Sequence, residues 1–107
     1  MATLSVLYFF DVKDDQGQVF IENWTKLTAL IYEYQGSLES RLHKTEDGRY
    51  CGYAMWPNKQ LWEQDWSNMP HKAKKYRDAM SGACASIKTL GTMNVLVDLI
   101  REETHKP

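Results

Sequence analysis

The sequence predicts an α+β fold with four strands and two helices in the order β-α-β-β-α-β. The prediction rests on segments that alternate apolar and polar residues, on one long segment with apolar residues at helical spacing, and on turns between them. The 107 residues, 43% hydrophobic and 25% charged, predict one globular domain over 1–107. Right-handed crossovers then place both helices on one face of a four-stranded antiparallel sheet, the ferredoxin-like split βαβ arrangement.

The first strand and the first helix have the clearest patterns. Residues 3–12 are rich in β-branched and aromatic residues and predict a strand, which a polar turn at 13–17 ends. A helix is expected over 20–34, with Gly36 as its left-handed cap. Its apolar residues recur every three or four positions and form one stripe: Phe20, Trp24, Leu27, Ile31 and Tyr34.

The middle of the chain predicts a β-hairpin. Residues 38–44 alternate as a half-buried strand does, and Asp47-Gly48 favours a tight turn before a third strand over 49–56. Pro57 ends that strand. Asn58 is a suitable cap for a short helix through Trp66.

The second helix is expected in two pieces, the second over 71–80. Residues 83–90 are small and have no clear assignment. A last strand is expected from Thr92 to about Ile100, followed by a polar tail from about 101.

The predicted sheet has no clearly polar face. The first strand places Leu7 and Phe9 opposite Val6 and Tyr8, so both of its faces are apolar in the middle. If the helices cover one face, the other needs a partner, and a second copy of the chain is the simplest. The alternative is a one-residue shift or bulge that makes one face polar. The hypothesis is a homodimer with its two sheets face to face.

Composition excludes several classes of protein. A net charge of −1 argues against binding nucleic acid or an anionic membrane mainly by charge, and no apolar run reaches the length of a membrane span. Residues 1–10 lack the pattern of a signal peptide. Cys51 and Cys84 are expected as reduced thiols in a cytoplasmic protein, and no His/Cys cluster has the spacing of a metal site.

The aromatic residues have two interpretations. Gly52 and Ala54 lie between Tyr50 and Trp56 on one face of the third strand, which leaves a gap against the helices. The gap is either a pocket for a flat aromatic ligand or space for close helix packing within a ring-filled core. A third reading is RNA binding, because Arg49 to Trp56 partly matches the signature of RNA-recognition modules, although the near-neutral charge argues against it.

The sequence resembles the antibiotic biosynthesis monooxygenase family of dimeric α+β barrels over about residues 4–97. The resemblance rests on the helix leading into Gln35-Gly36-Ser37-Leu38, on Ser40 to His43, on Tyr53-Ala54-Met55-Trp56 as the family's "YAxW", and on the aromatic helix that follows. It implies a homodimer with a pocket between sheet and helices in each subunit. Some members oxidise phenols or quinols with O₂ and no cofactor.

The resemblance also implies roles for particular residues. Trp56 matches a tryptophan that lines the family's site, Trp62 stands where a tyrosine is found, and Gly52 replaces an asparagine. A basic residue of the family falls near Tyr76 or Arg77. In haem-degrading relatives the tryptophan corresponds to Trp66, but the haem-ligating histidine corresponds to Tyr76, so no haem is expected.

Two functional hypotheses follow. The first is a cofactor-independent monooxygenase acting on a small aromatic phenol or quinol, and the alternative is a non-catalytic homodimer that binds or senses an aromatic metabolite. The candidate catalytic residues are His71, Tyr76 and Arg77. The candidate ligand-binding residues are Trp24, Tyr34, Gly52, Trp56, Trp62 and Trp66.

Overall fold

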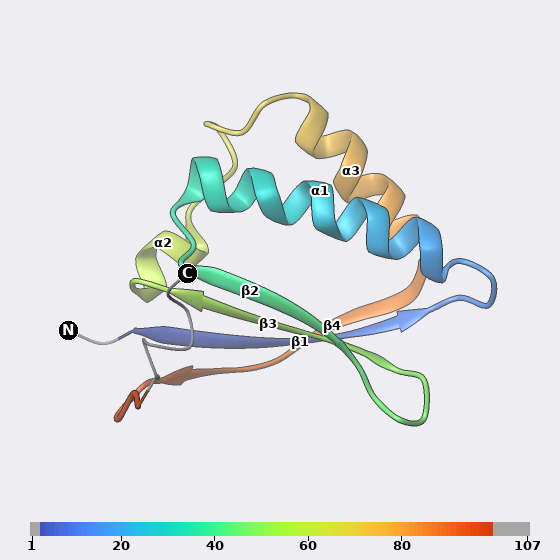
Figure 1. The fold of residues 1–107 in the computed structure, drawn as a ribbon. Helices are drawn as coiled ribbons and strands as arrows, with labels where there is room; N and C mark the ends of the chain where they lie inside the picture. Colours follow the sequence, from blue (N-terminus) through green and yellow to red (C-terminus); the bar gives the residue numbers. More distant parts are fainter. Residues whose placement is uncertain (1–2, 100–107) are drawn as a thin grey trace, which may run out of the picture.

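The computed structural model describes residues 3–99, and these form one antiparallel sheet with helices on one face (Figure 1). The strands are β1 (Leu4–Val12), β2 (Glu39–Lys44), β3 (Tyr50–Trp56) and β4 (Cys84–Asn94). The helices are α1 (Gly17–Gln35), α2 (Lys59–Glu63) and α3 (Lys72–Gly82). The strand order is β2-β3-β1-β4, with antiparallel pairing throughout. The predicted α+β, ferredoxin-like fold is confirmed.

The local signals for turns and caps are confirmed. Gly36 ends α1 with φ 86°, and Gly48 in the β2–β3 turn has φ 90°, both in the region that glycine adopts at little cost. The Asn58 side chain accepts a hydrogen bond from the Leu61 backbone N–H and caps α2. These positions depend on a few neighbouring residues, which explains why the sequence reveals them.

The last strand was predicted at the wrong place. It spans Cys84–Asn94 and not 92 to 100, so it includes most of the unassigned segment, while 95–99 lie beyond it. The reason is where α3 ends: the Lys13 backbone N–H bonds to the Ala83 carbonyl, next to the end of β1. The chain therefore begins pairing with β1 at once, from Val12–Cys84 to Leu4–Asn94. Ile100 and the polar tail lie outside the described residues.

The helix after Pro57 is shorter than expected. It ends at Glu63, because Gln64 has extended backbone and its side-chain N–H₂ group donates to the Leu61 and Gln35 carbonyls. Trp66 therefore lies in the connection between α2 and α3, where it packs against the main core. Among residues 3–99, none of the helices has the length and apolar character needed to cross a membrane.

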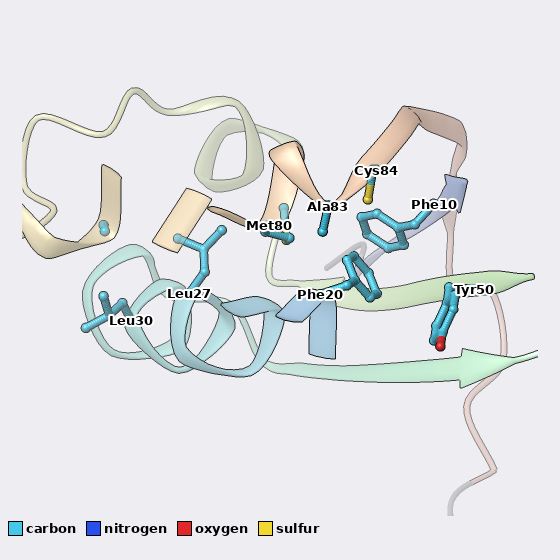
Figure 2. Close-up of a cluster of buried hydrophobic side chains, with 9 residues drawn as sticks. Phe10, Phe20, Leu27, Leu30, Tyr50, Met80, Ala83 and Cys84 are labelled. Atoms are coloured by element: carbon cyan, nitrogen blue, oxygen red, sulfur yellow. The ribbon is translucent and has the colours of Figure 1, made fainter. Parts of the chain in front are cut away.

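The main core lies between the sheet and the α1–α3 pair, at the end of the sheet where β3 begins (Figure 2). The Phe20 ring lies between those of Phe10 and Tyr50, with centroid distances of 4.9 and 5.2 Å. Phe20 is fully buried. Leu27 and Leu30 continue this core along α1 toward Met80 on α3. Burial of these side chains fixes the helices on the sheet.

The opposite face of the sheet is apolar in its centre, and no helix among residues 3–99 lies over it (Figure 1). Leu7 pairs with Tyr53, and Phe9 pairs with Cys51, on this side. All four side chains are only partly buried within the single chain. A bulge between Leu7 and Tyr8 leaves Leu90 of β4 without a partner in the β1 register, and Leu90 is largely exposed.

Candidate functional site

A cavity of about 310 Å³ lies between the sheet and the helices. Its walls come from all four strands, from α1 and α3, and from the α2–α3 connection. The aromatic residues that line it are Tyr8, Phe10, Trp24, Trp56 and Trp66. Tyr53 also borders it, although its side chain lies on the opposite face of the sheet, where its hydroxyl is 3.4 Å from Ser5 Oγ. The smaller apolar residues are Leu27, Ile31, Gly52, Ala54, Met80 and Ile87, and the polar ones are Thr28, Ser40, Arg77 and Ser81. The volume and the apolar walls are those of a small-molecule site.

Among the described residues that line the cavity, one side chain is charged, and it is a cation. Arg77 of α3 is exposed on its outer side and holds its guanidinium carbon 5.4 Å from the centroid of the Trp66 ring. Its Nε also lies 3.7 Å from the Asp78 carboxylate. None of the described residues that line the cavity is an Asp, Glu or His. An anionic group on a ligand would therefore meet a favourable partner at Arg77, although the Asp78 carboxylate beside it partly offsets that charge.

Gly52 is required by the packing around it. A Cβ atom at this position would lie 2.9 Å from Phe10 Cε2, and the Phe10 ring is held in the core by Phe20. Position 52, where the resemblance places an asparagine, has no room here for a side chain. Its partner across the β1–β3 ladder is Tyr8.

Tyr8 has a defined hydrogen bond. Its phenol oxygen accepts a hydrogen bond of 2.8 Å from the indole N–H of Trp62, which α2 holds behind the cavity wall. Burial raises the pKa of Tyr8, and the bond from Trp62 opposes that rise. Tyr8 is therefore a neutral phenol at physiological pH. Trp56 is 6% exposed, and its indole N–H has no acceptor among the described residues.

The cavity brings together some of the predicted ligand-binding residues. Trp24, Gly52, Trp56 and Trp66 line it. Tyr34 does not, because it is 45% exposed on the outer side of α1. Trp62 is also outside the lining and acts on it through Tyr8. Their roles in ligand binding stay predictions.

The predicted catalytic residues are more scattered. Arg77 lines the cavity, while His71 is exposed at the start of α3. Tyr76 is half-buried against the main core, and the Lys26 ammonium lies 5.5 Å from its ring centroid. The structure thus brings one of the three to the cavity. Within the described part of the chain, no His, Cys, Asp and Glu side chains gather in a group that could hold a metal ion.

Sequence reasoning did not assign Tyr8 to the site. Its signal was present, because Tyr8 shares a face of β1 with Leu4 and Val6, but only the pairing with Gly52 places it at the cavity. Ser40, Thr28 and Ser81 were missed as well. Small polar residues on exposed strands and helices have no pattern that distinguishes them from ordinary surface residues.

The fold and the cavity define a class: a ferredoxin-like α+β protein with an aromatic pocket between its sheet and its helices. In sequence comparisons, no protein-family model matches the chain, and no curated protein matches it. Solved structures do match. A candidate antibiotic biosynthesis monooxygenase from Bordetella bronchiseptica has a TM-score of 0.75 at 12% identity, covering 91% of this chain and 100% of that one.

Two other solved structures are also similar to this chain in fold. SnoaB, a cofactor-independent oxygenase from Streptomyces nogalater, has a TM-score of 0.75 at 13% identity, covering 94% of this chain and 100% of that one. A candidate antibiotic biosynthesis monooxygenase from Caulobacter crescentus has a TM-score of 0.72 at 17% identity, covering 90% and 92%. The resemblance is confirmed at the level of the fold: this chain has the fold of the antibiotic biosynthesis monooxygenases.

Proposed function

We propose that this protein is a cofactor-independent monooxygenase that acts on a small aromatic or polyketide-type phenol or quinol. The observation that carries the proposal is the cavity itself, about 310 Å³ in volume and lined by the rings of Trp24, Trp56 and Trp66. Such walls favour a flat aromatic ligand, since ring contacts supply affinity and shape selection. The similarity in fold to SnoaB, a cofactor-independent oxygenase, adds support.

The proposed reaction uses the substrate as the reductant. The substrate loses a proton to form a phenolate or enolate, and this anion transfers electrons to O₂. One oxygen atom enters a ring carbon as a carbonyl group, and the other leaves as water with two hydrogens from the substrate. The Arg77 guanidinium would stabilise the anion. His71 and Tyr76 remain proposed polar partners, and both require movement of substrate or side chain to reach the cavity.

A second candidate is a non-catalytic protein that binds or senses an aromatic metabolite. It is favoured by the absence of a carboxylate or imidazole among the described residues of the cavity wall, because the proposed oxidation needs a base. The two candidates share the ligand class and differ only in turnover.

Oxygen consumption and tryptophan fluorescence distinguish the two candidates. The panel contains naphthols, quinols and anthrones, each tested for quenching and for O₂ uptake. The monooxygenase predicts uptake with at least one tightly bound compound, and Arg77→Gln should lower that rate about 10-fold or more. Lys72→Gln, on the same helix and exposed, is the matched control. If every tightly bound compound quenches tryptophan fluorescence without O₂ uptake, the monooxygenase proposal is wrong and the non-catalytic binding function is supported.

We also propose that the protein is a homodimer that buries the uncovered face of the sheet. Support comes from Leu7, Phe9 and Tyr53, which form an apolar centre there that no helix of the described part of the chain covers. Sedimentation at micromolar concentration should report twice the chain mass of 12.5 kDa. Phe9→Asp should shift it to a monomer, because it places a charge in the buried interface, while Asp14→Lys in the exposed β1–α1 turn should not. A monomeric wild-type protein would contradict the proposal.

We propose a cytoplasmic location. It is supported by Cys51 and Cys84, which are free thiols with no disulfide between them.

A further inference from the structure

The hydrogen bond between Trp62 and Tyr8 fixes what Tyr8 can offer to the cavity. An indole N–H is only a donor, so the Tyr8 oxygen is the acceptor of this 2.8 Å bond. The phenol hydrogen must then point elsewhere. No acceptor for it is found among the described residues, and Tyr8 lines the cavity.

Burial keeps that hydrogen in place. The pKa of Tyr8 is raised above its ordinary value, chiefly by desolvation, so the side chain stays a phenol and does not become a phenolate. A phenol whose oxygen already accepts one bond from a fixed indole is a pre-oriented donor. Hydrogen bonding of a ligand to such a group costs little free energy, because the side chain needs no reorganisation.

We propose that Tyr8 is a specificity-determining residue that selects ligands carrying an acceptor oxygen, a carbonyl or phenolate, on the aromatic frame, and that Trp62 is its positioning residue. The inference rests on the proposed function, because it assumes that the cavity is the ligand site. It goes further by naming the chemical group that the sheet side of the cavity recognises. The Tyr8 hydroxyl, pre-oriented by Trp62, favours an oxygen acceptor there and disfavours an unsubstituted hydrocarbon edge.

A pair of probes that differ only in this oxygen tests the inference. 1-Tetralone and tetralin share one bicyclic frame, and only the first has a carbonyl. Calorimetric titration without O₂ should show tighter binding of 1-tetralone. Tyr8→Phe removes only the hydroxyl group, so we expect it to weaken 1-tetralone about 3- to 10-fold and to leave tetralin within about twofold. Tyr32→Phe, an exposed tyrosine on α1, is the control and should change neither.

Trp62→Phe tests the positioning role. The variant keeps a ring behind the wall but removes the N–H that holds Tyr8, so the preference for 1-tetralone over tetralin should fall, although Tyr8 itself is intact. A merely structural defect would weaken both probes together and leave their ratio unchanged. The ratio is therefore the readout, measured beside circular dichroism of each variant.

The outcomes separate this inference from the proposed function. If wild-type protein binds both probes equally, or if Tyr8→Phe weakens both equally, the inference is wrong while the aromatic site stands. If wild-type protein binds neither probe, the proposed aromatic site fails, and the inference fails with it. Absence of O₂ uptake with other compounds does not affect the binding ratio.

Discussion

The two ends of the space between sheet and helices use the same kind of residue in different ways. At the end where β3 begins, the rings of Phe10, Phe20 and Tyr50 pack against one another in the core (Figure 2). Toward the other end, Trp24, Trp56 and Trp66 surround a cavity. Two small residues, Gly52 and Ala54, lie between these sets of rings and line the cavity, and the Phe10 ring lies over Gly52. Aromatic content alone therefore does not distinguish core from site.

The largest expected effect comes from removing a ring at each end. Phe20→Ala should lower the free energy of unfolding by about 3–5 kcal/mol, because the side chain is fully buried and leaves a void. Trp66→Ala removes a larger ring that is only partly buried, so it should lower the free energy of unfolding by clearly less. The same substitution should weaken ligand binding, followed by fluorescence quenching, more than Phe20→Ala does. Urea unfolding followed by circular dichroism measures the first effect. Equal costs at both positions would contradict the division into a packed end and an open end.

A smaller effect is expected at the border between the two ends. Gly52→Ala should cost about 1–3 kcal/mol, because the new Cβ atom would meet Phe10 Cε2 at 2.9 Å. Gly91→Ala in β4 is the matched control, since no atom lies within 4 Å of its added Cβ. Phe10→Leu should reduce the cost of Gly52→Ala in the double variant, although it destabilises by itself. If the losses of unfolding free energy in the two single variants add up in the double variant, the Phe10 ring does not restrict position 52.

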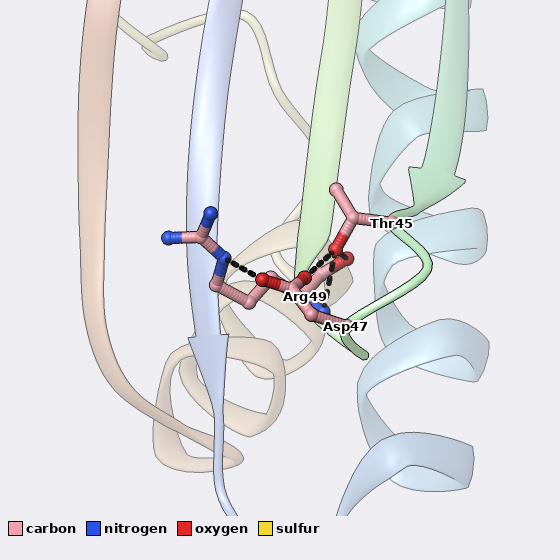
Figure 3. A network of polar contacts seen from close by, with 3 residues as sticks. All are labelled: Thr45, Asp47 and Arg49. Atoms are coloured by element: carbon pink, nitrogen blue, oxygen red, sulfur yellow. Dashed lines mark hydrogen bonds and ion pairs between the residues drawn. The ribbon is translucent and has the colours of Figure 1, made fainter.

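The smallest effect concerns the hairpin next to the packed end. There Thr45 donates to the Asp47 carboxylate, and the Arg49 Nε lies 3.2 Å from the same carboxylate (Figure 3). The Thr45 hydrogen bond is the main reason why the pKa of Asp47 is lowered. Any stability that it contributes is present above the ordinary pKa of an aspartate and is lost as the pH falls through the lowered value.

Thr45→Val should raise the Asp47 pKa toward the ordinary value, as measured by NMR titration of the carboxyl carbon. Asp65 is an internal control, because its pKa is lowered by hydrogen bonds from Ser67 and not by this network. An unchanged Asp47 titration would assign the shift to Arg49 instead. The unfolding free energy of the variant should change little, since all three residues are exposed.

Several parts of the fold could be predicted from the sequence because their signals are local. The alternation in 38–44 and 49–56, the caps at Gly36 and Asn58 and the turn at Gly48 each depend on residues close in the chain. The apolar stripe of the first helix also predicted which side packs on the sheet, although Tyr34 at its end is exposed. Side-chain periodicity and turn residues depend only on neighbouring residues, so these elements can be predicted without knowing which distant residues come together.

The candidate site was predicted only in part. Trp24, Trp56 and Trp66 line the cavity, and their roles in ligand binding stay predictions. Tyr8 was missed, and Trp62 acts from behind the wall. Whether a ring lines a cavity or stands behind it depends on the distance between two elements, which no local pattern encodes.

The sequence by itself determined the order of strands and helices, the turn positions and the apolar faces, since backbone preference and side-chain periodicity are properties of neighbouring residues. Only the tertiary structure decided where β4 begins, which side chain occupies the space over Gly52, and which groups meet at Tyr8. These depend on strand register and on contacts between residues far apart in the chain, such as the 2.8 Å bond between Tyr8 and Trp62. Such contacts exist only once the whole fold has formed.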